Sequence, residues 1–142
     1  VNFGLVDCAD RTEIRAAGGQ KGELYVATGY GLWKLKYDEN ADDFTAASLL
    51  GPENKAFCVG LGLGRSNGDY FAEQKMVYFN GIVDGVYGFY RTPDDGKTIR
   101  RINRENQMFG SIHSMDGDKR VFGRFYLATG SSGLLYGEEA KA

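Results

Sequence analysis

The sequence has few of the residues that most often build metal or cofactor sites. It contains a single histidine among 142 residues, so a multi-histidine metal site or a histidine-ligated cluster cannot be assembled from this chain. The net charge is only −2, and no cluster of lysine or arginine suggests a phosphate track. We therefore expect no metal, no cofactor and no nucleic-acid partner.

Long hydrophobic runs are missing as well. The apolar stretches fall well short of the ~20 residues that a transmembrane helix needs, so we expect no membrane partner. The first residues do not read as a signal peptide, although a mature secreted chain would have lost one. The two cysteines, Cys8 and Cys58, fit either a disulfide or two buried free thiols and do not fix a compartment.

Glycine and aromatic residues are abundant instead. The chain has 21 glycines but only two prolines, and its 13% of aromatic residues are chiefly tyrosine and phenylalanine. This composition is typical of an all-β protein with many tight turns. The run GLGLG at residues 60–64 lacks the spacing, the lysine and the following helix of a phosphate loop. We interpret its glycines as positions where strands approach closely, as near a propeller axis.

The stretch at residues 75–103 predicts three short strands, with a turn motif between the second and the third. Residues 92–98, TPDDGKT, fit the Asp-box pattern S/T-x-D-x-G-x-T-W, with Ile99 at the aromatic position. Pro93 fixes φ, and Gly96 supplies positive φ. The Asp94 carboxylate can accept hydrogen bonds from backbone N–H groups that lie two or three positions later in the sequence. Because Asp-boxes brace hairpins, we assign this motif a structural role. The three strands are predicted at residues 76–79, 86–91 and 99–103.

An internal repeat organises the chain. LYVATGYGLW at residues 24–33 returns as FYLATGSSGLL at residues 125–135, with MVYFNG at residues 76–81 between them. A period near 50 residues with about four strands per unit predicts a β-propeller built from four-stranded antiparallel blades. The blades fall at about residues 13–48, 56–103 and 111–137, and the last has three strands.

These blades are too few to close a ring. Two and three-quarter blades fall short of the roughly four to eight that a propeller needs, so residues 1–142 form one partial propeller segment. The chain is then part of a longer protein, which we favour, or a protomer that closes by oligomerisation. Residues 1–10 could supply a strand to another blade, and residues 138–142 read as a tail.

The most distinctive residues resemble a known family. GIVDGVYGFYRTPDDGKTIRRIN at residues 81–103, then Phe109-Gly110, then RVFGRFYLATGSSGLLYGE at residues 120–138 resemble the C-terminal end of glycoside hydrolase family 74. That family includes xyloglucanases and oligoxyloglucan reducing-end-specific cellobiohydrolases. The chain departs from the family pattern at Ile99 and at Gln107-Met108.

The resemblance implies a secreted, xyloglucan-active endo-β-1,4-glucanase with two propellers flanking a cleft for the glucan. Inverting hydrolysis uses two carboxyl groups, and no position here matches either family aspartate motif. The segment is therefore expected to be catalytically inert alone and to supply scaffold and cleft wall. The alternative is a non-catalytic Asp-box module that binds a glycan or a protein, or that closes by oligomerisation.

Propeller geometry places several polar and aromatic residues on one ligand-facing end. Tyrosine rings stack on sugars, and amide and carboxylate groups bond to hydroxyls. The competing interpretation is that the tyrosines pack between blades. Trp33 is expected in the core, and His113 is expected on an inner strand. Asp116 and Asp118 are expected in a solvated turn. The predicted substrate-binding residues are Tyr30, Asp84, Tyr87, Asn106, Gln107 and Ser131.

Overall fold

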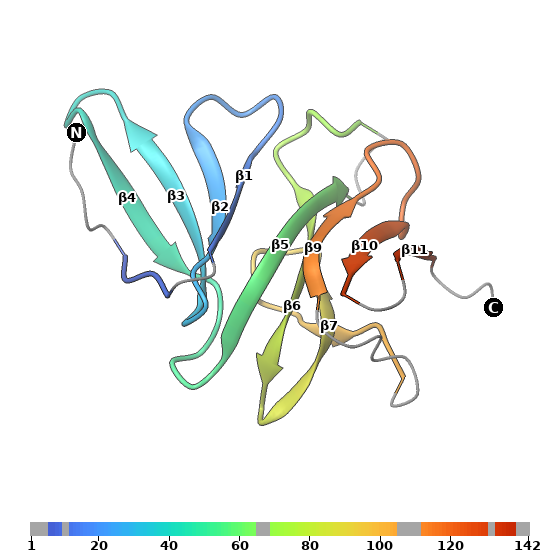
Figure 1. The fold of residues 1–142 in the computed structure, drawn as a ribbon. Helices are drawn as coiled ribbons and strands as arrows, with labels where there is room; N and C mark the ends of the chain where they lie inside the picture. Colours follow the sequence, from blue (N-terminus) through green and yellow to red (C-terminus); the bar gives the residue numbers. More distant parts are fainter. Residues whose placement is uncertain (1–5, 10–11, 65–68, 105–111, 131–132, 139–142) are drawn as a thin grey trace.

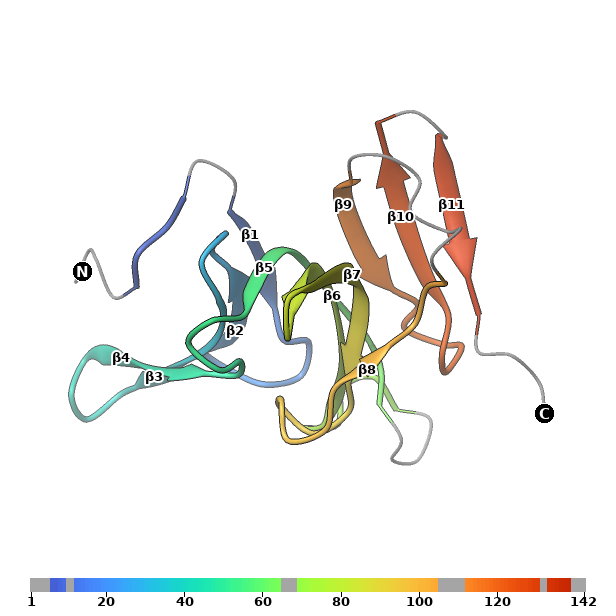
Figure 2. The ribbon, with the colours of Figure 1, turned by 90° about the horizontal axis from the view of Figure 1, so that it is seen from below.

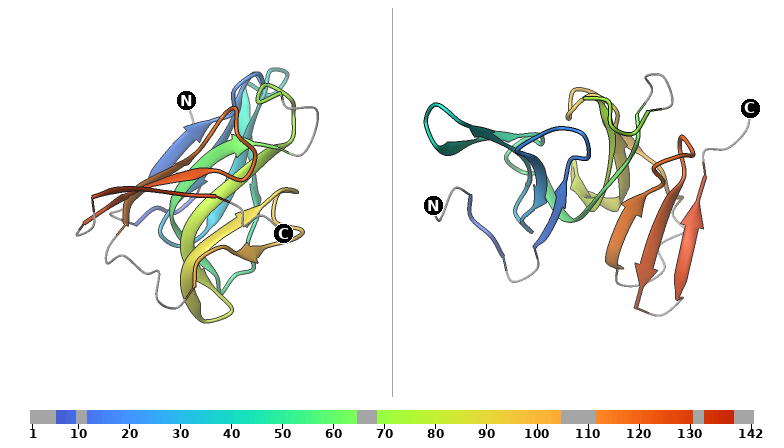
Figure 3. Two further views of the ribbon diagram at one scale, coloured as in Figure 1. Left: turned by 90° about the vertical axis from the view of Figure 1, so that its right-hand side faces the viewer. Right: turned by 90° about the horizontal axis from the view of Figure 1, so that it is seen from above.

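The computed structural model describes residues 6–9, 12–64, 69–104, 112–130 and 133–138. Three antiparallel sheets follow one another along the chain and fan out without closing a ring (Figures 1, 2 and 3). The first sheet has the order β1 (Glu13–Ala16), β2 (Glu23–Ala27), β3 (Leu32–Asp38), β4 (Asp43–Ser48). The second has the order β5 (Lys55–Leu63), β6 (Lys75–Val83), β7 (Val86–Thr92), β8 (Arg100–Arg101). The third has the order β11 (Leu134–Gly137), β10 (Phe125–Thr129), β9 (Ile112–Gly117).

The predicted all-β class and the antiparallel, mostly four-stranded sheets are confirmed, and no described residue is helical. At the N-terminus, residues 6–9 form no strand, and the Ala9 N–H donates to the Thr28 carbonyl oxygen over 2.7 Å. That residues 1–10 complete another blade stays a prediction. Cys8 is exposed and Cys58 is buried, and the two do not form a disulfide with each other.

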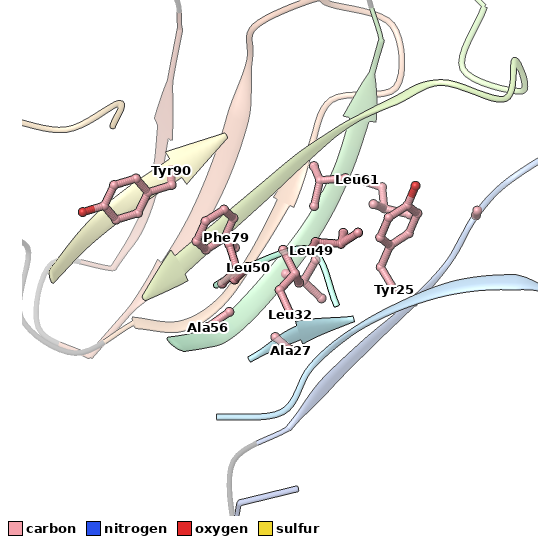
Figure 4. Close-up of a cluster of buried hydrophobic side chains, with 12 residues drawn as sticks. Tyr25, Ala27, Leu32, Leu49, Leu50, Ala56, Leu61, Phe79 and Tyr90 are labelled. Atoms are coloured by element: carbon pink, nitrogen blue, oxygen red, sulfur yellow. The ribbon is translucent and has the colours of Figure 1, made fainter. Parts of the chain in front are cut away.

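The second sheet lies between the other two and contributes to both hydrophobic clusters. On β6, Val77 and Phe79 pack toward the first sheet, while Met76 and Tyr78 pack toward the third. A strand covered on both faces gains stability from every apolar side chain, which explains the unbroken apolar run. Figure 4 shows the first cluster, in which Phe79 and Tyr90 stack with ring centroids 5.4 Å apart.

The inner strands β5 and β9 approach each other as the glycine run predicted. A Cβ at Gly60 would overlap the Cα of Asp116, and one at Gly62 would lie 3.2 Å from the Cα of Gly117. Carboxylates bond to the backbone N–H groups on this side of β5: Glu13 accepts from Val59 over 3.3 Å and Asp116 from Leu61 over 3.0 Å. The close approach of inner strands is thus confirmed.

Two strand boundaries differ from the prediction. The sequence Asn80-Gly81 was expected to end a strand, but β6 continues to Val83. Gly81 instead lies beside the irregularity of β5 between Ala56 and Cys58, where a Cβ would be 2.9 Å from the Ala56 Cα. The strand predicted at residues 99–103 shortens to β8, because the Asn103 side chain accepts the Phe89 N–H over 2.9 Å in place of a backbone carbonyl.

Candidate functional site

Three connections gather at one end of the sheets, at the bottom of Figure 1, and we call this end the loop face. They are residues 28–31, which join β2 to β3, residues 49–54, which join β4 to β5, and residues 84–85, which join β6 to β7. One hydrogen bond ties the first connection to the start of β5, and another ties the second connection to the third. The Gly29 N–H donates to the Ala56 carbonyl over 2.8 Å, and the Asp84 N–H donates to Asn54 Oδ1 over 3.0 Å.

The connection that carries Tyr30 is held in one conformation. The buried hydroxyl of Thr28 accepts the backbone N–H of Tyr30 over 3.2 Å and that of Gly31 over 3.0 Å. Gly29 has a φ of 84°, a conformation that favours glycine. The Tyr30 side chain is 57% exposed, so it does not pack between the described sheets.

Asp84 and Tyr87 lie at the β6–β7 hairpin. Asp84 is exposed with a φ of 51°, and Gly85 follows with a φ of 80°, as a tight two-residue turn requires. The Tyr87 hydroxyl accepts a hydrogen bond from Asn80 Nδ2 over 2.7 Å, and its ring centroid lies 6.4 Å from that of Phe57. Tyr87 is therefore half-buried and held in place.

The sequence-predicted residues Tyr30, Asp84 and Tyr87 thus share the loop face, although they come from separate strands and turns. Asn106, Gln107 and Ser131 lie outside the described residues. Asn80 was missed because it was assigned to the end of a strand. It is almost fully buried, and its Oδ1 has no hydrogen-bond partner in the part of the chain that the structure describes, so it is an acceptor beside Tyr87.

Trp33 also differs from its expected place in the core. It is half-buried and lines a cavity of about 310 Å³ at the loop face, together with Tyr30. A larger cavity of about 610 Å³ lies between the second and third sheets, with several arginines on one side and Phe125, Leu127 and Tyr136 on the other. None of the described candidate residues lines this larger cavity.

Among the described residues, two carboxyl groups have displaced pKa values, and both are unsuited to act as acids at neutral pH. The pKa of Asp94 is lowered, chiefly by the hydrogen bond from the Thr98 side chain. The pKa of Asp118 is lowered, chiefly by the hydrogen bond from the Tyr126 hydroxyl. A general acid for glycoside hydrolysis needs a raised pKa instead. Asp116 is engaged as well, since it accepts from Leu61 and pairs with Lys119 at 2.9 Å.

A charged cluster joins the first two sheets away from the loop face. The Tyr25 hydroxyl donates to Asp95 over 2.8 Å, and the Lys34 ammonium lies 3.0 Å from the same carboxylate. Burial, more than the neighbouring Asp95, raises the pKa of Tyr25. The cluster holds the β7–β8 turn against β2 and β3, so its contacts are structural.

The described residues include no grouping of three or more histidine, cysteine, aspartate or glutamate side chains fit to hold a metal ion. Across the described ranges, no helix is long and apolar enough to cross a membrane.

Known proteins resemble the chain along most of its length. It is 35% identical over 129 residues to the xyloglucanase Xgh74A of Acetivibrio thermocellus, and 30% identical over 135 residues to a xyloglucanase of a Paenibacillus species. These matches cover 90% and 89% of the chain but only 14% and 12% of the relatives. No family model matches the sequence.

Solved structures show the same relationship. The family GH74 xyloglucanase of Xanthomonas campestris superimposes with a TM-score of 0.76 at 30% identity, over 95% of this chain and 18% of that one. The GH74 enzyme of Niastella koreensis gives a TM-score of 0.68 at 30% identity, over 87% of this chain and 17% of that one. The predicted fold class, an incomplete β-propeller, is confirmed by this similarity.

Proposed function

The chain belongs to glycoside hydrolase family 74, as a segment of it, and we propose that it is part of the C-terminal propeller of a secreted, xyloglucan-active endo-β-1,4-glucanase. The observation that carries this proposal is the 35% identity over 90% of the chain to a xyloglucanase. In the proposal, the segment supplies scaffold and cleft wall for the glucan, and the catalytic aspartates lie outside this chain.

The scaffold role is supported by the carboxylates that the fold already uses. Glu13 and Asp116 accept backbone N–H groups of β5, and Asp95 binds Tyr25 and Lys34. Carboxylates engaged in this way are poor candidates for proton transfer to a glycosidic oxygen. Each of them instead connects one sheet to its neighbour.

The turn at residues 92–98 is, in this proposal, an Asp-box of the BNR-repeat type. Asp94 Oδ1 accepts the Thr98 N–H over 2.7 Å and the Thr92 hydroxyl over 3.0 Å, and the Thr92 hydroxyl accepts the Gly96 N–H over 2.8 Å. The Thr98 hydroxyl also donates to Asp94 Oδ2. These bonds support a bracing role. The backbone N–H that Asp94 accepts belongs to Thr98, four positions later in the sequence, and not to a residue two or three positions later.

Contact with the polysaccharide is assigned to the loop face. Tyr30 and Tyr87 would present ring faces to sugars, and Asp84 would accept from hydroxyl groups. Carbohydrate binding there would extend to Asn106, Gln107 and Ser131. Tyr30 and Asp84 are exposed while their backbone is fixed by hydrogen bonds, which supports preorganised binding.

The other partners would be the remaining propeller blades, in the same chain or in other subunits. A net charge of −2 supports the absence of a nucleic-acid partner, and we propose no membrane partner. Secretion is proposed because a polysaccharide too large to cross a membrane is met outside the cell.

The test is hydrolysis of xyloglucan by the full-length native protein that carries this segment. We expect new reducing ends, with the anomeric configuration inverted when the first product is observed by NMR. A protein that binds xyloglucan without cleaving it would contradict the hydrolase proposal and favour the non-catalytic module.

A further inference from the structure

The cavity of about 310 Å³ at the loop face lies beside an exposed tyrosine and the only tryptophan of the chain. Its volume falls at the lower end of the ~300–1,000 Å³ typical of small-molecule sites. The cavity is bordered by the β2–β3 loop, by the first part of β3, by the β4–β5 connection and by Asp7 from the N-terminal stretch. We call it the Trp33 groove, and the lining residues that bear on its chemistry are Asp7, Tyr30, Gly31, Trp33 and Asn54.

The groove combines aromatic surface with unused hydrogen-bonding groups. The Trp33 indole lies against Gly31, where an added Cβ would be 3.3 Å from Nε1, so its N–H is a donor beside the β2–β3 loop. Asn54 accepts from Asp84 through Oδ1, which leaves its Nδ2 group as a donor. Asp7 is exposed and supplies an acceptor.

These groups select one class of ligand. Among the described residues, no lysine or arginine lines the groove, while Asp7 does, so an anionic ligand such as a phosphate would be repelled. A metal ion would find a single carboxylate among the described lining residues. A neutral molecule with an apolar face and a rim of hydroxyl groups would use both the rings and the polar groups.

We propose that the Trp33 groove is a sugar-binding subsite in which Trp33 and Tyr30 contact a pyranose ring. The inference rests on the proposed function, because it takes a β-glucan as the ligand. Asn54 connects this subsite to the second part of the loop face, since its Oδ1 holds the backbone of Asp84. The glucan would run from the Trp33 groove past Asn54 toward Asp84 and Tyr87.

The test follows Trp33 directly in the full-length native protein. Tryptophan is replaced biosynthetically by 5-fluorotryptophan, and the ¹⁹F resonance of position 33 is identified by its loss in Trp33→Phe. Xyloglucan oligosaccharides should shift this resonance saturably, whereas α-linked malto-oligosaccharides should not. Trp33→Ala and Tyr30→Ala should each raise the Kd for the xyloglucan oligosaccharide about tenfold, the loss expected for one aromatic contact.

Phe71→Ala provides the matched control. Phe71 is 65% exposed, comparable to Tyr30, but lies in the β5–β6 connection at the opposite end of the sheets. The control should leave the Kd unchanged. Because Tyr30 is exposed, its variant keeps the test valid even if Trp33→Ala unfolds.

Two negative results can be told apart. If the protein hydrolyses xyloglucan while the Trp33 resonance stays fixed at saturating oligosaccharide, the groove is covered by another part of the protein. That result overturns the subsite and leaves the proposed function standing. If the protein neither binds nor hydrolyses xyloglucan, the proposed function fails and the subsite fails with it.

Discussion

The Lys75 ammonium donates a hydrogen bond to the Gly18 carbonyl oxygen over 2.6 Å and so ties the second sheet to the first. It also donates to the carbonyl oxygens of Ala72, over 2.6 Å, and Tyr70, and lies 4.4 Å from the Tyr70 ring centroid. The side chain is fully buried, and this desolvation lowers the pKa of its ammonium group. A buried cation held by three carbonyls is thus an anchor between two loops.

Lys75→Met is expected to release that anchor. Three carbonyl oxygens would lose their donor, and the free energy of local opening should fall by about 2–4 kcal/mol. Amide hydrogen exchange at residues 18–22 and 69–75 of the native protein measures the loss. Lys21→Met is the control, because the Lys21 side chain is 87% exposed and its surface ion pair with Glu39 should contribute little. Equal amide exchange rates in Lys75→Met and Lys21→Met would contradict the assignment of Lys75 as an anchor between the loops.

Gly60→Ala tests the close approach of β5 and β9. The added Cβ would overlap the Asp116 Cα, so the strands must separate, at a cost of about 3 kcal/mol. Gly51→Ala is the matched control, because its Cβ would meet only Asn54 Nδ2 at 3.6 Å. Thermal unfolding should show a clear drop in Tm for the first variant only. A similar Tm for both would mean that the inner strands can move apart freely.

Tyr25 and Asp95 are expected to be energetically coupled. Tyr25→Phe removes a hydrogen bond to a carboxylate in a nearly buried site and should cost about 1.5–3 kcal/mol. In an Asp95→Ala background the same change should cost much less, because the partner is already gone. A double-mutant cycle from urea unfolding gives the coupling energy. Additive effects would show that the pair does not join the sheets.

Asp94 should make the turn sensitive to acid. Its pKa is lowered from the usual 3.8 in the folded state, so its stabilisation is complete above that value. The stabilisation is then lost as the pH falls through the lower folded pKa. The difference in unfolding free energy between the native protein and Asp94→Asn should therefore be largest near neutral pH and shrink below about pH 4. A difference that stays constant down to about pH 2 would contradict this assignment.

The strands could be predicted because their signals are local. Runs of β-forming residues end at turns that need positive φ, such as Gly29, Gly96 and Gly133. The glycines at 60 and 62 also gave a correct packing prediction, because a glycine inside a strand often marks the place where another backbone comes close. Composition, spacing and turn chemistry therefore sufficed for most of the fold.

The differences arise where distant residues decide the local conformation. Asn80-Gly81 has the sequence of a turn, yet β6 continues through it because the irregular part of β5 needs a glycine opposite. Asn103 shortens β8 by bonding to Phe89 through its side chain. The pairing of Gly81 with β5 and the bond between Asn103 and Phe89 cannot be predicted from the neighbouring sequence. The role of Asn80 beside Tyr87 was missed for the same reason.

The candidate site was predicted only in outline. Tyr30, Asp84 and Tyr87 were expected at one end because connections between second and third strands share a face in a propeller, and the structure places them there. The partial exposure of Trp33 was not expected. Trp33 was expected in the core, but the sequence of a strand does not show how close a residue lies to the open end of its sheet.

The most direct test of the central claim is the kcat for xyloglucan hydrolysis by the full-length native protein with single carboxylates of this segment replaced. The variants are Asp84→Asn, Asp95→Asn, Asp116→Asn and Asp118→Asn. If the segment is scaffold and cleft wall, each folded variant should keep kcat within about threefold, and Asp84→Asn should mainly raise KM. Loss of a true acid or base lowers the rate by ~10²–10⁴-fold. A fall of that size in any folded variant would place the catalytic machinery inside this chain and contradict the account.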